Sequence, residues 1–390
     1  MSLLAKFSDL AEQRAALGSA DPSKVVIEEI LSPTEAIING RRTILAGTNN
    51  YLGLTFDPAC VAAGQEALAK MGTGTTGSRM ANGNYSGHRA LERELAEFYD
   101  YPYAMIFSTG YAANLGVLSA LLGPDDAVLL DADAHASLYD GASMTRAGIY
   151  RFKHNDPDSL DKRLSRLKDR AARTLVVIEG LYSVLGDTAP LKEFVEVKEC
   201  HDALLMVDEA HSLGVYGEHG RGVVESSGTQ ERVDFVVGTF SKSLASTGGF
   251  CVSRHQELEL FQYASRPYMF TASPCPSVIA TTRAALHALR TRPELKNRLW
   301  HNAERLYTAL KSRNLWLGPE LSPVVAVRLE DRGLALNAWQ RLLESGVYCN
   351  LMLPPAAPEG GSLLRFSLSA AHTDEQVDAL IERIGALGLS

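Results

Sequence analysis

The chain has 390 residues, of which 46% are hydrophobic and 22% are charged, a composition typical of a globular protein and not of a disordered one. Its net charge of −8 and a pI near 5.7 argue against nucleic acid or an anionic membrane as a general electrostatic partner. Five scattered cysteines include no close C-x-x-C pair, which speaks against a zinc site or a disulfide framework and favours a reducing cytoplasm. No apolar run of about 18 residues occurs, so we expect no transmembrane helix.

The length exceeds one ordinary core, so we expect a large domain with smaller flanking parts. Residues 1–45 are predicted to form an N-terminal arm, with a helix and then a hairpin whose turn is the Asn-Gly pair at residues 39–40. Residues 46–290 are predicted as the large domain and residues 291–390 as a smaller α+β C-terminal domain. A long helix beginning near Ser277 would join the two.

The stretch at residues 72–79 satisfies G-x-G-x-x-G, which is the fingerprint of a dinucleotide site. That fingerprint has to follow a strand and open a helix, whereas the Ala-rich segment before this stretch has a helical pattern. Nucleotide binding is therefore disfavoured. A second helix is expected next, with Ser86 as a candidate N-cap and with Leu91, Leu95 and Phe98 on one face.

From residue 103 onward, short apolar segments alternate with helical stretches. This pattern predicts an α/β fold with a mainly parallel sheet covered on both faces. Ligands bind such sheets beyond the carboxyl ends of the strands. The expected strands lie at residues 103–108, 127–131, 174–179, 203–208 and 235–238. The polar groups that follow them lie at residues 108–111, 131–135, 179–183, 208–211 and 239–242. The chemistry is thus predicted to gather at one edge of the sheet.

The segment at residues 234–250 is an apolar run that stops at a lysine among hydroxyls and glycines. Small residues and hydroxyls at 238–243 are suited to surrounding a phosphate, with the Lys242 amine beside it. Desolvation and neighbouring charge can lower the pKa of an ammonium enough to expose a nucleophilic amine, so Lys242 is a candidate Schiff-base former. On this segment alone, a solvated loop lysine is an equal alternative.

Asp208 follows a buried strand, and its carboxylate is suited to holding a pyridine nitrogen protonated. Two alternatives compete with this interpretation. The Asp-Glu-Ala-His string at 208–211 resembles a helicase box, but the chain has no G-x-x-x-x-G-K-[ST] loop. The second alternative is a metal site formed by His135, Asp208 and His211, although their spacings are unremarkable and no fourth ligand suggests itself. Taken singly, a strand-end aspartate can also simply cap a helix, and a histidine can simply pack.

These groups do not occur singly. Gly110 lies at a predicted strand-to-helix turn, where free N–H groups and the helix dipole favour a phosphate. Tyr111 is suited to packing on an aromatic ring or filling the core, and His135 to covering the ring's other face or capping a turn. With Thr239, Ser241 and the lysine, the set supplies a phosphate cradle, a ring sandwich, a nitrogen partner and an amine. Together they predict pyridoxal phosphate as the cofactor.

On these motifs, the chain resembles the α-oxoamine synthase family. These fold-type I pyridoxal-phosphate enzymes condense an amino acid with an acyl thioester and lose carbon dioxide. Within the family, the chain is most similar to bacterial members that use L-serine, notably at residues 266–273 and in the prolines at 354–355. The resemblance covers nearly the whole length and is carried by residues 47–53, 77–79, 131–137, 179–183, 207–212 and 238–242.

The resemblance implies a role for each matching residue. Lys242 would form the Schiff base with the cofactor and remove the substrate α-proton, while Asp208 would hold the pyridinium. His135 would stack on the ring and help to orient the substrate carboxylate, and His211 would contact the phenolic oxygen. Other residues expected at the cofactor are Gly110, Tyr111, Ser183, Thr239 and Ser241, with Thr271 and Ala272 reaching in from a second subunit. The implied assembly is a homodimer with shared active sites.

The implied reaction is the decarboxylating condensation of L-serine with a long-chain acyl thioester such as palmitoyl-CoA. Its product would be 3-ketosphinganine, the first intermediate of sphingolipid synthesis. Asn50, Tyr51 and Arg365 are expected at the substrate. Arg365 would bind the carboxylate of the substrate. The protein is expected in the cytoplasm, and peripheral contact with the inner membrane stays open, as does the choice between coenzyme A and an acyl carrier protein.

One position departs from the family pattern. Members that use serine carry a second arginine just before the two prolines, and this chain has Leu353 there. A sibling synthase that uses glycine, alanine or another amino acid is therefore the alternative. A non-catalytic subunit that regulates an active partner is a third interpretation, against which the presence of Lys242 argues.

Overall fold

The computed structural model describes residues 3–5, 7–18, 20–354, 357 and 360–389. It separates into two compact units. The large unit comprises residues 49–183 and 187–297, and the small unit residues 1–48, 184–186 and 298–390. The N-terminal residues thus group with the C-terminal part, and the three-part division predicted from the sequence stays a prediction.

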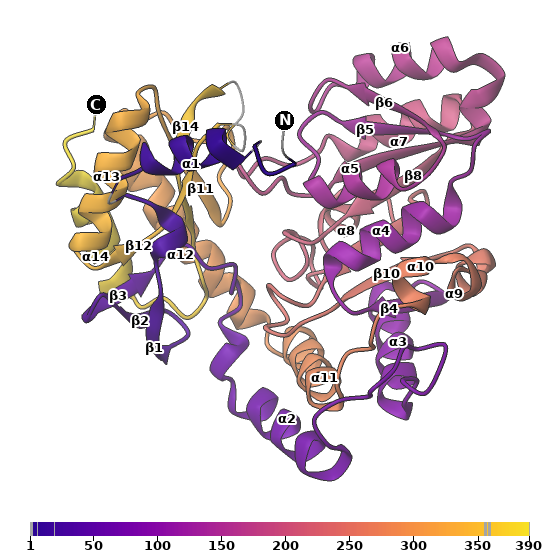
Figure 1. Cartoon of the computed structure of the whole chain (residues 1–390), viewed down its shortest axis with the longest axis horizontal. Helices are drawn as coiled ribbons and strands as arrows, with labels where there is room; N and C mark the ends of the chain where they lie inside the picture. The colour runs from indigo at the N-terminus through magenta and orange to yellow at the C-terminus, as the bar shows by residue number, and fades with distance from the viewer. Residues whose placement is uncertain (1–2, 6, 19, 355–356, 358–359, 390) are drawn as a thin grey trace. The chain divides into compact units, whose positions relative to one another are not determined.

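The large unit is built on a seven-stranded sheet with the strand order β4-β10-β9-β8-β7-β5-β6 (Figure 1). All neighbours are parallel except β10, which is antiparallel to both β9 and β4. The strands are β4 Tyr103–Phe107, β5 Ala127–Asp131, β6 Gly148–Phe152, β7 Thr174–Glu179, β8 Leu204–Asp208, β9 Phe235–Thr239 and β10 Gly249–Ser253. Every strand predicted for this sheet is confirmed, and β6 and β10 are additional.

Helices cover both faces of this sheet. Successive side chains of a strand point to opposite faces, so each strand contributes apolar side chains to both. In β5, Leu129 joins a core with α3, α6, α7 and α11, while Val128 and Leu130 join a second core with α4 and α5. Figure 1 shows α4 and α5 lying side by side. The helices are α2 Pro58–Met71, α3 Ser86–Tyr99, α4 Gly110–Leu121, α5 Ala136–Ser143, α6 Pro157–Leu167, α7 Leu191–Cys200, α8 Val223–Ser226, α9 Phe261–Ala264, α10 Arg266–Met269 and α11 Pro276–Thr291. Short 3₁₀ turns are η2 Leu54–Phe56, η3 Lys168–Arg173 and η4 Gln256–Leu260.

The start of α3 corrects one prediction. Ser86 is the first helical residue and not the N-cap, which is Tyr85. The backbone N–H of Tyr85 donates to His88 Nδ1 at 3.1 Å, so the imidazole at the third helical position satisfies the N–H of the N-cap residue. The glycine-rich stretch at 72–79 lies between α2 and α3 and follows no strand, as the case against a dinucleotide site requires.

The small unit holds two further sheets, with the orders β1-β2-β3-β12 and β11-β14-β13. The predicted hairpin is confirmed, since Asn39 and Gly40 both have positive φ, at 52° and 67°, as a tight turn between twisted strands needs. Of the two prolines at 354–355, Pro355 lies outside the described residues. The strands are β1 Ile27–Ser32, β2 Glu35–Ile38, β3 Arg41–Leu45, β11 Val324–Leu329, β12 Val347–Tyr348, β13 Asn350–Met352 and β14 Ser362–Ser367. The helices are α1 Phe7–Ala15, η1 Pro22–Lys24, α13 Arg332–Glu344 and α14 Asp374–Gly385, and α12 Pro293–Lys311 runs from the large unit into the small one.

Within the described ranges, no helix combines the length and the apolar character needed to cross a membrane.

Candidate active site

A cavity of about 270 Å³ opens at the carboxyl ends of the strands of the large unit. It brings together groups from the ends of β7, β8 and β9 and from the starts of α4 and α5. The predicted site residues that line it are Gly110, Tyr111, His135, Asp208, His211, Thr239, Ser241 and Lys242. Thr109, Asn114, Ser137, Glu179, Ala210 and Gly238 complete the lining. The expectation that these side chains would gather at one edge is therefore met.

Asp208, at the end of β8, is fixed from two sides. Its Oδ1 accepts the backbone N–H of Ala210 at 2.9 Å, and its Oδ2 accepts the side-chain amide of Asn114 at 2.7 Å. Asn114 lies on α4 and is 3% exposed. Because the amide is held by the helix, the carboxylate at the floor of the cavity keeps one orientation.

The same amide begins a chain of hydrogen bonds that reaches His135. Asn114 Nδ2 donates to Ser137 Oγ at 2.9 Å, and this hydroxyl lies 2.7 Å from His135 Nδ1. The backbone N–H of Ser137 also donates to Nδ1, at 3.2 Å. Since that N–H can only donate, Nδ1 is the acceptor and the ring proton lies on Nε2. Asp208 and His135 are thus positioned by one connected network.

The imidazole of His135 is neutral in this setting. Part of the residue remains open to solvent, but the surrounding protein desolvates the ring and lowers the pKa of His135. The Asp208 carboxylate acts to raise the pKa of His135, and the nearby Lys242 ammonium, like desolvation, acts to lower it. A neutral ring with its N–H on Nε2 can stack on an aromatic group and donate one hydrogen bond.

Glu179, at the end of β7, is a buried carboxyl that the sequence did not single out as a site residue. It is 4% exposed and accepts the backbone N–H of His135 at 2.5 Å. Burial, and then the neighbouring Asp208 carboxylate, raise the pKa of Glu179 well above its usual range. Glu179 therefore fixes the His135 backbone without adding a second full negative charge beside Asp208.

His211 is oriented by a residue that is far away in the sequence. The Tyr51 hydroxyl lies 2.7 Å from His211 Nδ1, and the two rings meet edge to face. Tyr51 is fully buried, so it reaches the site through His211 and does not line the cavity. Its neighbour Asn50 donates to Thr55 and also lies outside the cavity lining. The sequence placed both residues at the substrate, a role that stays a prediction.

The turn after β9 and the start of α4 form a close-packed corner. A Cβ on Gly110 would come within 2.7 Å of Thr239 Cβ, so only glycine allows this approach. Thr239 Oγ1 lies 2.9 Å from both Ser241 Oγ and the carbonyl of Gly248. The N-terminus of α4 therefore presents its free N–H groups next to two hydroxyls, which is an arrangement suited to an anion.

Lys242 follows directly in this turn and is half-buried. It lines the cavity, where its positive charge adds to the lowering of the pKa of His135 and partly opposes the rise in the pKa of Glu179. Tyr111, at the cavity mouth, donates its hydroxyl to Asp140. A ring fixed in this way can pack on a ligand but has its polar end occupied.

Besides Asn50 and Tyr51, four more predicted site residues lie outside this cavity. Ser183, Thr271 and Ala272 belong to the large unit, where Ala272 pairs with Ser78 in an isolated bridge. Arg365 belongs to the small unit. It lies on β14, is 5% exposed, and donates to Asn350 Oδ1 at 3.2 Å and to Ser367 Oγ at 2.9 Å.

The metal alternative finds no support in the part of the chain that the structure describes. There, no group of three or more histidine, cysteine, aspartate or glutamate side chains is arranged to hold a metal ion. Asp208 is instead surrounded by an amide, a backbone N–H and histidine rings.

Comparison with known proteins identifies relatives of the chain. The serine palmitoyltransferase of Caulobacter vibrioides (strain NA1000 / CB15N) is 53% identical over 369 residues, which are 95% of this chain and 91% of that protein. The solved structure of Sphingomonas wittichii serine palmitoyltransferase is 50% identical with a TM-score of 0.97, covering all of this chain and 98% of the other. A high-resolution structure of SPT with a PLP internal aldimine matches with the same identity, TM-score and coverage.

The predicted fold, that of the fold-type I pyridoxal-phosphate enzymes, is confirmed by this likeness. The model of one family, described as aminotransferase class I and II, matches residues 42–384, which is most of the sequence. The chain therefore belongs to the aminotransferase class I and II family.

Proposed function

We propose that the chain is a pyridoxal-phosphate enzyme that condenses L-serine with a long-chain acyl thioester to form 3-ketosphinganine. The overall reaction forms one carbon–carbon bond and releases carbon dioxide and a free thiol, so its atoms balance without a further reactant. The observation that carries the proposal is the set of Asp208, Asn114, Ser137 and His135, joined by hydrogen bonds in the cavity that also contains Lys242. The serine palmitoyltransferases at 50–53% identity support the choice of substrates.

The groups that line the cavity fit pyridoxal phosphate. Among the described residues, the buried Asn114 Oδ1 has no hydrogen-bond partner, and it lies on a side chain that lines the cavity floor. The crowded corner between Gly110 and Thr239, beside the free N–H groups of α4, suits a phosphate. Asp208 is suited to a protonated pyridine nitrogen, and His211 to the phenolic oxygen. Lys242 supplies the amine for the aldehyde.

When bound, pyridoxal phosphate supplies an electron sink for the bond that breaks at the substrate Cα. The residues of the chain supply the rest. Asp208, held in place by Asn114, maintains a negative charge where a ring cation needs one. The Lys242 amine removes the proton from the serine Cα and later returns one to the product. His135, neutral and fixed through Ser137, donates its Nε2–H to the substrate carboxylate.

Arg365 is proposed to bind the substrate carboxylate from the small unit. Its guanidinium is held by Asn350 and Ser367. A guanidinium presents its N–H donors in a rigid planar fork, a geometry that matches a carboxylate. Asn50 is proposed to contact the substrate as well, and Ser183 to contact the cofactor.

A homodimer with shared active sites belongs to the same proposal. Thr271 and Ala272 are exposed and lie outside the cavity of their own chain, as residues that serve a second copy would. Coenzyme A and an acyl carrier protein are the two candidate carriers of the thioester, and thiol release from each tests which one is used. A cytoplasmic location, with peripheral contact at the inner membrane, rests on the cysteine pattern and on the acyl substrate.

The experiment uses purified protein with pyridoxal phosphate, L-serine and palmitoyl-CoA. We expect free thiol and carbon dioxide in equal amounts. Borohydride is expected to attach the cofactor irreversibly to the peptide that contains Lys242, and Lys242→Ala is expected to lose both this attachment and the thiol release. If Lys242→Ala kept a cofactor absorbance that borohydride removes, the role of the lysine would be wrong. The absence of thiol release from the unmodified enzyme would contradict the proposed reaction.

A sibling synthase is the second candidate, and Leu353 is the observation that favours it. It is half-buried and directly follows β13. An apolar side chain at this position cannot pair with a carboxylate, so glycine or alanine stays an alternative amino donor.

A further inference from the structure

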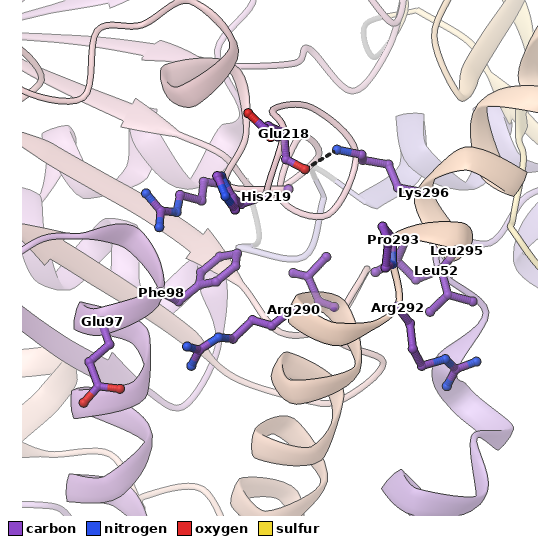
Figure 2. Close-up of a pocket in the computed structure, with 13 residues that line it drawn as sticks. Leu52, Glu97, Phe98, Glu218, His219, Arg290, Arg292, Pro293, Leu295 and Lys296 are labelled. Atoms are coloured by element: carbon purple, nitrogen blue, oxygen red, sulfur yellow. Dashed lines mark hydrogen bonds between the residues drawn. The ribbon is translucent and has the colours of Figure 1, made fainter.

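A second cavity lies in the large unit, between α3, α11, the start of α12 and the loop at residues 217–221. Its volume is about 370 Å³, and none of the residues that line it belongs to the lining of the site above. Figure 2 shows the side chains that surround it. Nothing in the proposed function uses this cavity.

One part of the wall is apolar. Phe98 from α3 and Leu289 from α11 are buried, and Leu52, which precedes η2, is 1% exposed. Pro293 and Leu295 from the start of α12 add to this surface. The cavity therefore has room and contacts for an apolar body.

The rest of the wall carries an excess of positive charge. Arg221, Arg290, Arg292 and Lys296 line the cavity against two acids, Glu97 and Glu218. Two of the cations are already engaged. Arg292 is paired with Asp57 and points away from the cavity in Figure 2, and Lys296 Nζ donates to the carbonyl of Glu218 at 2.7 Å.

The other two cations are available. Arg290 is exposed, and its side chain has no hydrogen bond or ion pair within the described ranges of the chain. The Nε of Arg221 is buried and lacks a hydrogen-bond partner among the residues that the structure describes. The guanidinium of Arg221 lies over the ring of Phe98, 5.9 Å from its centroid. This contact leaves the guanidinium edge, with its donors, for a ligand.

The loop that carries Arg221 is held in place before any ligand binds. The Glu225 carboxylate accepts the backbone N–H groups of His219 at 3.1 Å and of Arg221 at 3.0 Å. A Cβ on Gly220 would come within 2.9 Å of Leu289 Cδ1, so the loop packs tightly on α11. A fixed backbone lowers the entropy cost of ordering the guanidinium on binding.

We propose that this cavity binds a small anionic amphiphile, with a carboxylate or phosphate head between Arg221 and Arg290 and a short apolar tail against Phe98, Leu52 and Leu289. Guanidinium groups bind both head groups through paired N–H donors. A volume of about 370 Å³ is near the lower end of the roughly 300–1,000 Å³ typical of ligand pockets. An eight-carbon chain suits it, and a full acyl-CoA does not.

The position of the cavity connects it to the candidate active site through two chain segments. Leu52 directly follows Tyr51, and the loop that carries Arg221 begins a few residues after His211. A Cβ on Gly214 would lie 3.1 Å from Leu52 Cδ1, so the two segments touch. A bound amphiphile would thus contact both segments that carry the Tyr51–His211 hydrogen bond.

Isothermal titration calorimetry on the cofactor-loaded enzyme tests the proposal, with octyl phosphate and octanoate as probes. We expect saturable binding of at least one probe at one site per chain, and no binding of octanol or of inorganic phosphate alone. Arg290→Gln and Arg221→Gln are each expected to weaken binding roughly tenfold, which corresponds to the loss of one charge-assisted interaction. Tighter binding of octyl phosphate would assign a phosphate head, and tighter binding of octanoate a carboxylate head.

Arg232→Gln is the matched control. It removes a surface arginine of the same unit that pairs with Glu199 and does not line the cavity, so it should leave the affinity unchanged. Arg290→Gln removes an exposed side chain and is expected to keep the wild-type fold and the condensation activity. Equal affinity in the wild type and in both cavity variants would overturn the proposal, as would the failure of both probes to bind. Neither outcome bears on the condensation reaction.

Discussion

The hydroxyl of Tyr51 lies 2.7 Å from Nδ1 of His211, although 160 positions separate the two residues in the sequence. Tyr51 is fully buried and His211 is 6% exposed. The hydrogen bond therefore forms away from bulk water, where it is worth more and its loss costs more. It constrains the orientation of an imidazole that lines the candidate active site.

Tyr51→Phe tests this relationship. The variant leaves a buried imidazole nitrogen without its partner, so we expect a loss of about 1–3 kcal/mol in the free energy of unfolding. Affinity for pyridoxal phosphate should fall as well, which absorbance titration measures. Tyr101→Phe is the control, because its hydroxyl is also buried but donates to the carbonyl of Gln230, outside the cavity. Equal effects of the two variants on cofactor affinity would refute a specific role for Tyr51.

Asn114→Ala should weaken the site through Asp208 and His135 together. The variant removes the donor that holds Asp208 Oδ2 and the donor to Ser137 Oγ. We expect kcat to fall roughly tenfold to a hundredfold, since both groups then lose their fixed orientation. Asn302→Ala serves as the comparison, because it removes a buried asparagine that donates only to backbone carbonyls of the small unit. A kcat unchanged in Asn114→Ala would contradict the connected network.

His154 should make stability depend on pH in the alkaline range. Burial alone would lower its pKa, but hydrogen bonds with Asp131 at 2.8 Å and Asp187 at 2.7 Å raise the pKa of His154 to about 10. The folded pKa lies above the unfolded value near 6.5, so the stabilisation is complete below about pH 6.5. It is lost at roughly 1.4 kcal/mol per pH unit as the pH rises toward 10.

Urea unfolding of the wild type and of His154→Gln measures this dependence. The stability difference between them should be largest near pH 6 and should shrink steadily above about pH 6.5. His201→Gln, which removes a single ion pair with the exposed Asp161, is the control. A difference that stayed constant with pH would mean that His154 is not held protonated by its two carboxylates.

The ion pair of Arg79 and Glu92 is expected to be a strong determinant of stability. It is bidentate, with N–O distances of 3.0 and 3.1 Å, and both side chains are nearly inaccessible. Arg79→Met leaves a buried carboxylate without its main partner and should cost about 3–5 kcal/mol. Arg89→Met removes the exposed second arginine on Glu92 and should cost less than about 1 kcal/mol. Chemical denaturation of both variants measures the loss in the free energy of unfolding. Similar losses in the two variants would contradict a dominant role for the Arg79–Glu92 pair.

The parts of the fold that the sequence predicted are those where burial leaves a clear pattern. Strands covered on both faces, such as β7 and β8, read as continuous apolar runs with a polar group at the end. The edge strand β6 alternates exposed and half-buried side chains and carries Arg151, so it shows no such run. Strand β10 begins at Gly249, the second of the two glycines after Lys242, so the sequence did not separate it from the candidate loop.

The site could be predicted as a set of groups but not as a network. Lys242, Asp208 and His135 each follow a recognisable strand, and parallel strands end at one edge. The amide of Asn114 lies 94 positions from Asp208, and no local pattern states which residue of a helix faces a given strand end. The only signal in the sequence was that Asn114 lies in the second turn of the helix after β4. The bond between Tyr51 and His211 depends on tertiary packing in the same way.

The choice of amino donor is the most direct test of the proposed function. Purified enzyme with pyridoxal phosphate and palmitoyl-CoA is supplied with L-serine, glycine or L-alanine, and thiol and carbon dioxide release are measured together. We predict equal yields of the two products and a kcat/KM for L-serine that exceeds those for glycine and L-alanine by roughly tenfold or more. A higher kcat/KM for glycine or L-alanine, or no thiol release with L-serine, would contradict it.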